Sequence, residues 1–128
     1  MRTLLVEDDD DLRREIGEFL RRRGHDVTAC GSLAQARATF ATMAATEPPE
    51  AVICDVNLPD GNGVDFLSEA APKLPACRWV LMSGGYDPDA VAQKLEAIPG
   101  PPRWTIVEKP VSMRTLDDAI RMVPKPAT

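Results

Sequence analysis

Four short apolar runs in this chain each end in residues that carry a charge or a hydroxyl group. They are Leu4–Val6 before Glu7 and Asp8, Val52–Cys54 before Asp55, Val80–Met82 before Ser83, and Ile106–Val107 before Glu108 and Lys109. Such runs are typical of strands in a parallel sheet. The carboxyl ends of those strands share one edge, where ligands bind. We therefore expect the carboxylates of Glu7, Asp8 and Asp55 to meet there with the hydroxyl of Ser83 and the ammonium of Lys109. This set suits a divalent cation and a phosphoryl group.

Strand-like and helix-like segments alternate along the chain. Strands are predicted over residues 2–7, 25–29, 51–54, 78–82 and 104–107, and amphipathic helices over 10–23, 33–46, 64–71, 87–98 and 113–123. Asp10, Ser32 and Ser112 are predicted to cap helices, and Gly24 to end the first one. Five strands that alternate with five helices indicate an α/β fold, with helices on both faces of a parallel sheet. The pattern alone does not fix the strand order.

Length and charge limit the class of protein. A chain of 128 residues suits one domain, which we expect over residues 1–123, followed by a short proline-containing tail at 124–128. The net charge of −5 argues against non-specific binding to the phosphate backbone of nucleic acid. The sequence shows neither a transmembrane run nor a signal-peptide pattern, and its three scattered cysteines suit buried thiols. We therefore expect a cytoplasmic protein.

The carboxylates are the first candidates for chemistry. Glu7 and Asp8 directly follow a buried run, whereas Asp10 and Asp11 fit the ordinary role of acidic residues at a helix start. Carboxylates held close together repel unless a cation compensates them, and Mg²⁺ prefers such oxygen ligands. Asp55 alone fits a turn aspartate equally well. Beside a bound cation it can instead act as a nucleophile and form an acyl phosphate.

Ser83 and Lys109 complete the predicted set. Either residue alone is an ordinary turn hydroxyl or a surface lysine, but each follows a different strand at the same edge. Lysine supplies a positive charge for a phosphate, and serine can donate a hydrogen bond to it. The Lys109–Pro110 bond is a candidate cis peptide. His25 begins a strand at the opposite edge, so we interpret it as structural or exposed.

These features together resemble the receiver domain of two-component response regulators. The resemblance rests on the acidic pair Glu7-Asp8, on Asp55 within Cys-Asp-Val-Asn-Leu-Pro-Asp-Gly, on Ser83 within Leu-Met-Ser-Gly-Gly, and on Lys109-Pro110. It covers essentially the whole chain with the motifs in the family's order. The resemblance implies a flavodoxin-like, doubly wound sheet of five parallel strands in the order 2-1-3-4-5, with five helices.

The resemblance also assigns roles. It implies that Asp55 accepts a phosphoryl group from a histidine kinase or a histidine phosphotransfer protein. It implies Mg²⁺ bound by Asp8, Asp55 and the backbone carbonyl of Asn57, with Glu7 acting through water. Lys109 would pair with the carboxylate or the phosphoryl group, and Ser83 would be the switch hydroxyl.

Signalling would then reach a downstream protein through the surface of helix 4, strand 5 and helix 5. The family often has an aromatic residue three positions before the lysine, where this chain has Ile106. The chain therefore has no aromatic ring at the position that the family usually couples to the switch hydroxyl.

The expected function is a stand-alone phosphoacceptor switch in a two-component system or phosphorelay, without enzymatic activity beyond self-catalysed phosphotransfer and slow autodephosphorylation. Two alternatives stay open. An Asp-nucleophile phosphohydrolase generally has a second aspartate two residues on, where this chain has Asn57. An interaction module that works without phosphorylation would be favoured by a damaged acidic site. A flavin or nucleotide binder is disfavoured, because an acidic run replaces the glycine-rich loop after the first strand.

Overall fold

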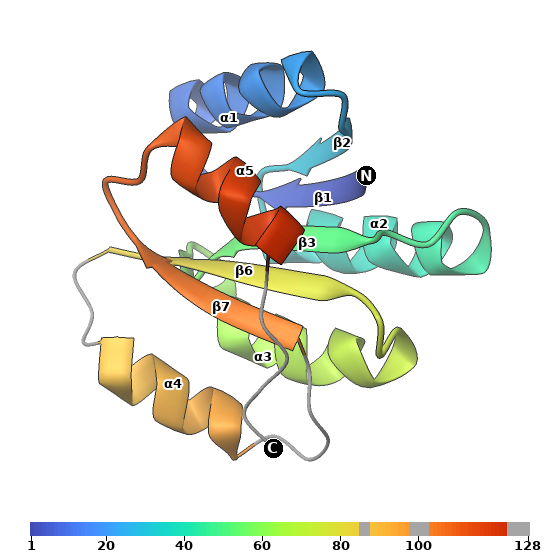
Figure 1. Ribbon diagram of the computed structural model, residues 1–128. Coiled ribbons are helices and arrows are strands. Elements are labelled where there is room, and N and C mark those ends of the chain that lie inside the picture. The colour runs from blue at the N-terminus through green and yellow to red at the C-terminus, as the bar shows by residue number, and fades with distance from the viewer. Residues whose placement is uncertain (85–87, 98–102, 123–128) are drawn as a thin grey trace.

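The central feature of the computed structural model is a parallel sheet of five strands in the order β2-β1-β3-β6-β7 (Figure 1). Its strands are β1 (Arg2–Val6), β2 (Asp26–Cys30), β3 (Ala51–Asp55), β6 (Arg78–Ser83) and β7 (Arg103–Glu108). The structure describes residues 1–84, 88–97 and 103–122, so the predicted tail at 124–128 lies outside the described residues. Counted by strand along the chain, the order is the predicted 2-1-3-4-5, and that prediction is confirmed.

Helices cover both faces of the sheet, as predicted. Helices α1 (Asp10–Arg22) and α5 (Met113–Met122) lie on one face. The other face carries α2 (Leu33–Ala45), α3 (Gly63–Ala70) with a 3₁₀ turn (Ala71–Lys73), and α4 (Pro88–Glu96). Within the described ranges, no helix combines the length and the apolar character needed to span a membrane.

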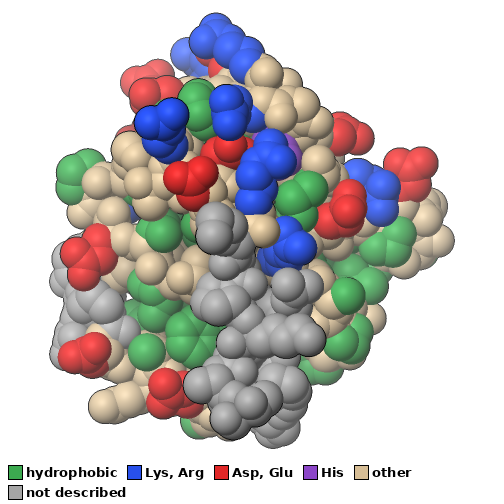
Figure 2. All heavy atoms as spheres, in the orientation of Figure 1, with side chains coloured by type: hydrophobic (Ala, Val, Ile, Leu, Met, Phe, Trp, Pro, Cys, Tyr) green, Lys and Arg blue, Asp and Glu red, His purple; other side chains and the backbone are tan. Residues whose placement is uncertain are grey.

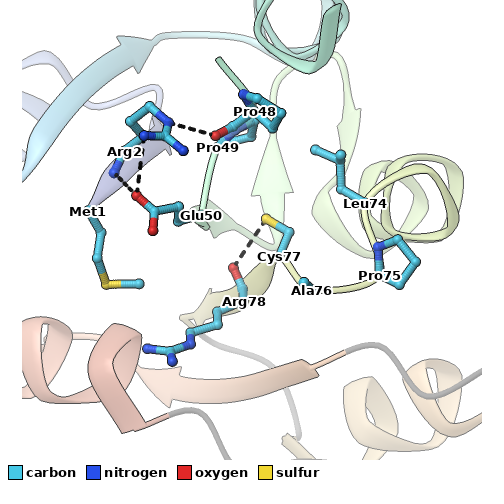
Figure 3. Close-up of a pocket in the computed structure, with 10 residues that line it drawn as sticks. All are labelled: Met1, Arg2, Pro48, Pro49, Glu50, Leu74, Pro75, Ala76, Cys77 and Arg78. Carbon is cyan, nitrogen blue, oxygen red and sulfur yellow. Dashed lines mark hydrogen bonds and ion pairs between the residues drawn. The ribbon is translucent and has the colours of Figure 1, made fainter. Parts of the chain in front are cut away.

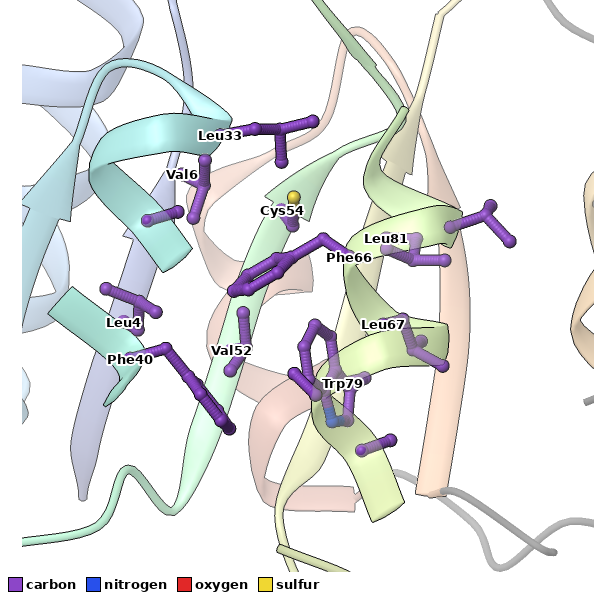
Figure 4. Packing of buried hydrophobic residues seen from close by; sticks show 14 of the residues in the cluster. Leu4, Val6, Leu33, Phe40, Val52, Cys54, Phe66, Leu67, Trp79 and Leu81 are labelled. Atoms are coloured by element: carbon purple, nitrogen blue, oxygen red, sulfur yellow. The ribbon is translucent and has the colours of Figure 1, made fainter. Parts of the chain in front are cut away.

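The hydrophobic core is divided into two layers by the sheet. The larger layer lies under α2, α3 and α4, and its centre is an aromatic cluster of Phe40, Phe66 and Trp79 (Figure 4). The ring centroid of Phe66 lies 5.8 Å from that of Phe40 and 5.4 Å from that of Trp79, and both ring pairs are edge to face. Such pairs contribute about 0.5–1.5 kcal/mol each beyond burial. The core therefore fixes α2 and α3 against β3 and β6.

The helix ends follow the sequence signals with one correction. Asp9 caps α1 by accepting hydrogen bonds from two backbone amides of the first turn, so the prediction that Asp10 is the cap was wrong by one residue. Ser32 caps α2, and the hydroxyl of Ser112 accepts a bond from the first turn of α5. Gly24 ends α1 with a φ of 89°, a conformation that favours glycine.

A small hairpin lies between β3 and α3, where the sequence predicted neither a strand nor a helix. Strands β4 (Asn57–Leu58) and β5 (Gly61–Asn62) pair antiparallel, and α3 begins directly after them. The amide oxygen of Asn62 caps α3 by accepting a bond from Val64 N at 2.7 Å. The hairpin therefore projects from the carboxyl edge of the sheet, where the candidate residues gather.

Candidate functional site

Three carboxylates from two strands meet at the carboxyl edge of the sheet. Glu7 and Asp8 follow β1, and Asp55 ends the neighbouring strand β3. One carboxylate oxygen from each of the three lies within 4.8 Å of the others. Glu7 is buried and Asp8 is exposed, so the group opens to solvent on one side. The structure thus brings together residues that are 47 positions apart in the chain (55 − 8).

Lys109 bridges two of these carboxylates. Its Nζ donates to Glu7 Oε1 at 2.6 Å and to Asp55 Oδ2 at 2.7 Å. The backbone holds the lysine in place, because Lys109 N donates to Ser83 O at 2.8 Å. The Lys109–Pro110 peptide is cis, as the sequence suggested. A side chain at Gly84 would crowd the lysine stem, since an added Cβ would lie 3.3 Å from Lys109 Cδ.

Burial and neighbouring charges shift the pKa values of Glu7 and Lys109. Complete burial, together with the negative charge of Asp55, raises the pKa of Glu7 to about 7, against the opposing hydrogen bond from Lys109. Burial by itself would lower the pKa of Lys109, but its bonds to Asp55 and Glu7 outweigh this and raise that pKa. Lys109 is therefore an ammonium at neutral pH.

Asp55 is held in place by the backbone around it. Its Oδ1 accepts a bond from Asn57 N at 3.0 Å, and Gly63 N donates to Val56 O at 2.8 Å. An added Cβ at Gly63 would lie 2.3 Å from the carbonyl oxygen of Asp55, which leaves room for no side chain there. The side chain of Asp55 keeps a small opening to solvent, at 8% exposed. An incoming group can therefore reach a carboxylate whose orientation is already fixed.

Ser83 lies at the end of β6, one residue beyond Met82, which pairs with Asp55 in the sheet. It is 3% exposed, and among the described residues its Oγ has no hydrogen-bond partner. A buried hydroxyl without a partner costs about 1–3 kcal/mol. The Ser83 hydroxyl is therefore free to donate a hydrogen bond to an oxygen placed beside it.

The donor set fits a hard divalent cation. Three carboxylates carry three negative charges, and Lys109 supplies one positive charge, so an excess of two negative charges remains when all are ionised. All of the candidate ligands are oxygens, which Mg²⁺ prefers, and exposed Asp8 leaves room for the waters that Mg²⁺ usually keeps. The residues present therefore suit Mg²⁺ in number, type and charge.

Comparison with known proteins agrees with this arrangement. The family model described as "Response regulator receiver domain" matches residues 3–121. The chain belongs to this family. Among solved structures, the receiver domain of the hybrid histidine kinase CckA has a TM-score of 0.74 at 26% identity, and the match covers 94% of this chain and 96% of that one. The chemotaxis response regulator CheY4 of Vibrio cholerae has a TM-score of 0.79 at 20% identity, over 96% and 98% of the two chains.

Curated relatives of this receiver domain are longer proteins. The photosynthetic apparatus regulatory protein RegA of Cereibacter sphaeroides is 31% identical over 63% of this chain and 42% of its own length. The sensor kinase CckA of Brucella abortus is 28% identical over 92% of this chain but only 12% of its own length. The chain therefore spans less than half the length of these two relatives. Receiver domains thus occur both in regulators and in kinases.

The single histidine of this receiver domain belongs to a second polar cluster, at the opposite edge of the sheet. His25 Nε2 lies 2.7 Å from Asp117 Oδ1 on α5, and both side chains are almost fully buried. Arg23 and Arg121 also donate to the Asp117 carboxylate. Figure 2 shows the basic side chains that gather over α1 and α5 around this point. Of the two predicted possibilities, structural or exposed, His25 is therefore structural, and it connects the α1–β2 turn to α5.

A shallow pocket of about 350 Å³ lies beside the amino-terminal ends of β1, β3 and β6 (Figure 3). Its polar groups already have partners. Arg2 pairs with Glu50 and donates to Pro48 O at 2.9 Å. The guanidinium of Arg78 donates to two carbonyls at the end of α5. This pocket lies at the other end of the strands from the carboxylates and contributes nothing to their chemistry.

Two features of the acidic site were not predicted from the sequence. One is the direct pairing of Glu7 with Lys109, because Lys109 was expected to pair with the Asp55 carboxylate or the phosphoryl group and Glu7 to act through water. The other is the role of Asp60, which accepts two backbone bonds from the start of α2. A signal for the second existed, because aspartate is a preferred helix-capping residue. The helix that it caps is distant in sequence, and only the fold reveals it.

Proposed function

We propose that this receiver domain is a cytoplasmic phosphoacceptor switch in a two-component system or phosphorelay, with Asp55 as the acceptor. The observation that carries the proposal is the carboxylate of Asp55, which is fixed by Asn57 N and Lys109 Nζ and keeps a small opening to solvent. The donor is a phosphohistidine on a histidine kinase or a histidine phosphotransfer protein. A carboxylate oxygen of Asp55 forms a bond to phosphorus while the P–N bond breaks, and the histidine nitrogen keeps the electron pair.

The residues around Asp55 support this transfer. The ammonium of Lys109, which pairs with Glu7 and Asp55, would follow the added charge onto a phosphoryl oxygen. Asp8, Asp55 and the backbone carbonyl of Asn57 would hold Mg²⁺, with Glu7 acting through water. When bound, that cation neutralises charge and orients the phosphoryl group. Lys109 and the cation site together would lower the repulsion between two anions that must approach each other.

Ser83 connects the acceptor to the output in this proposal. Its unpartnered hydroxyl would donate a hydrogen bond to a phosphoryl oxygen, which ends the cost of its burial. The end of β6 would then shift toward Asp55 and change the surface of α4, β7 and α5, where a downstream protein would dock. Ile106 on β7 is half-buried and packs against the larger core layer. Its aliphatic side chain would transmit the shift by packing rather than by turning a ring.

Incubation with Mg²⁺ and acetyl phosphate tests the proposal. Mass spectrometry of the intact protein should show one added phosphoryl group, stable in acid and labile in base. The adduct should be absent from Asp55→Asn and after chelation of the metal. Many turnovers of acetyl phosphate without a lasting adduct would instead indicate a phosphohydrolase. The complete absence of label in the presence of Mg²⁺ would favour an interaction module that works without phosphorylation.

A further inference from the structure

The amino-terminal end of α2 has two caps, and they come from different parts of the chain. Ser32, the residue before the helix, accepts a bond from Gln35 N at 3.2 Å. Asp60 accepts one bond from Leu33 N and one from Ala34 N, both at 2.9 Å, through its two carboxylate oxygens. A helix start leaves four amides without partners inside the helix. Asp60 satisfies two of them from a loop that is 26 and 27 residues away.

Asp60 belongs to the turn between β4 and β5, and the hairpin rests on the same helix end. Leu58 is buried in the core layer that also contains Leu33. Gly61 has a φ of 152°, and an added Cβ there would lie 2.8 Å from Leu33 Cδ1. Apolar packing and two hydrogen bonds therefore fix the tip of the hairpin against the first turn of α2.

The base of the same hairpin contacts the proposed phosphoacceptor. Asn57 N donates to Asp55 Oδ1 at 3.0 Å, and Asn57 pairs with Asn62 across the hairpin. The carbonyl of Asn57 is also the proposed backbone ligand for Mg²⁺. A displaced hairpin tip would therefore move both a hydrogen-bond donor to Asp55 and a metal ligand. The path from α2 to the acceptor is short and consists of direct contacts.

The charge of Asp60 strengthens this connection. The bonds from Leu33 N and Ala34 N hold the pKa of this carboxyl below its usual value. A carboxylate is also favoured at a helix start, where the helix dipole is positive. Asp60 is therefore a carboxylate at neutral pH, although it lies at the surface.

We propose that Asp60 is a positioning residue for the acceptor site: by capping α2 it holds the β4–β5 hairpin, and through it Asn57, in the geometry that Asp55 and Mg²⁺ require. The inference deepens the proposed function and rests on it for the role of Asp55. It makes the start of α2 a part of the framework of the site. Groups that hydrogen-bond directly to metal ligands commonly change metal affinity by roughly 10–100-fold. Asp60 acts on the proposed ligand through the hairpin, so we expect an effect at the lower end of that range.

Two alanine variants separate this role from simple support of the helix. Asp60→Ala and Ser32→Ala both remove a cap from the same end of α2, but only the first breaks the contact with the hairpin. Asp60→Ala should weaken Mg²⁺ binding in calorimetry by about tenfold. Ser32→Ala should leave that affinity within about twofold although it lowers the melting temperature. Asp60→Asn, which keeps one acceptor oxygen, should fall between Asp60→Ala and the natural protein.

The amide resonance of Asn57 gives a readout that needs neither metal nor phosphate. In Asp60→Ala without Mg²⁺, this amide should exchange with solvent several times faster, because its bond to Asp55 Oδ1 is loosened. Ser32→Ala should leave the exchange unchanged. Equal exchange and equal Mg²⁺ affinity in the two alanine variants would overturn the inference. A natural protein that takes no label on Asp55 would overturn the proposed function instead, while a difference in Asn57 exchange would still support the positioning role.

Discussion

Removal of the Ser83 hydroxyl should stabilise the free protein, although it removes a group proposed to be essential for switching. The Oγ atom is buried and, within the described part of the chain, has no hydrogen-bond partner. An unsatisfied buried hydroxyl costs about 1–3 kcal/mol. The small cavity left by the missing oxygen atom is destabilising and offsets part of this stabilisation. Ser83→Ala should therefore raise the free energy of unfolding by roughly 0.5–2 kcal/mol.

Thr3→Val is the matched control. Thr3 is fully buried on β1, but its hydroxyl donates to Met1 O at 3.1 Å. Loss of that bond leaves the carbonyl with one partner fewer, so the control should be neutral or destabilising by up to about 1 kcal/mol. Urea unfolding followed by circular dichroism, without Mg²⁺ or phosphodonor, gives both values. The two substitutions should therefore change stability in opposite directions or by clearly different amounts.

Phosphorylation should stabilise the natural protein more than Ser83→Ala. With Mg²⁺ and excess acetyl phosphate, the natural protein gains the hydrogen bond from Ser83 to the phosphoryl group, and Ser83→Ala does not. The rise in melting temperature on phosphorylation should be smaller in the variant, although mass spectrometry still shows the adduct on Asp55. If Ser83→Ala unfolded more easily than the natural protein by 1 kcal/mol or more, the hydroxyl would have a partner already, and the reasoning would fail.

Three further predictions concern the rest of the molecule. Lys109→Met should bind Mg²⁺ at least about tenfold more tightly in calorimetry, because a positive charge is lost beside Glu7 and Asp55. The variant should nevertheless take up phosphate from acetyl phosphate more slowly than the natural protein. Weaker Mg²⁺ binding by the variant would contradict this prediction. Gly63→Ala should destabilise the fold by about 1–3 kcal/mol in urea unfolding, because the added Cβ would overlap the Asp55 carbonyl oxygen. Gly17→Ala is the control and should be neutral or stabilising, because its Cβ meets only the end of an arginine side chain. Asp117→Asn should lose roughly 2–4 kcal/mol at pH 7, a value reduced for the exposure of its arginine partners. Bonds from His25 and the arginines outweigh burial and hold the pKa of Asp117 below its usual value. Its contribution to stability is therefore present at neutral pH and is lost as the pH falls through the lowered pKa of the folded protein. The difference in stability between Asp117→Asn and the natural protein should shrink in acid.

The sequence predicted the sheet and its chemical edge because both depend on local patterns. Each buried strand is a short apolar run, and the residue after it must lie at the carboxyl edge whatever the strand order is. The pairing of β1 with β3 then brings Asp8 and Asp55 together without any further signal. The strand order itself came from the resemblance, because hydrophobic periodicity contains no information about which strands are neighbours.

Contacts that depend on the exact path of the chain were not predictable. The hairpin of β4 and β5 was not predicted, because strands of two residues have no detectable period. The bond from Asp60 to the start of α2 and the pairing of His25 with Asp117 each join elements that are distant in sequence. The cap of α1 was misplaced by one residue, because four aspartates in succession offer several equivalent candidates.

The two polar edges of the molecule differ in whether their buried polar groups have partners. At the amino-terminal edge, the Asp117 carboxylate accepts bonds from His25, Arg23 and Arg121, so its charge is compensated. At the carboxyl edge, Glu7 is buried with a raised pKa and Ser83 has no hydrogen-bond partner among the described residues.

An unpartnered buried atom alone does not indicate a functional site. Trp79 Nε1 is also buried without a partner in the described chain, but it belongs to the aromatic cluster under α2 and α3, among apolar neighbours. What distinguishes Ser83 is its place beside excess negative charge and an accessible carboxylate at the same sheet edge. A cation and a phosphoryl group would remove both costs at once, because the cation compensates the carboxylates and the phosphoryl oxygens accept the bond from the hydroxyl. The uncompensated carboxylates and the unpartnered hydroxyl therefore indicate the same two ligands as the geometry of the site, a divalent cation and a phosphoryl group.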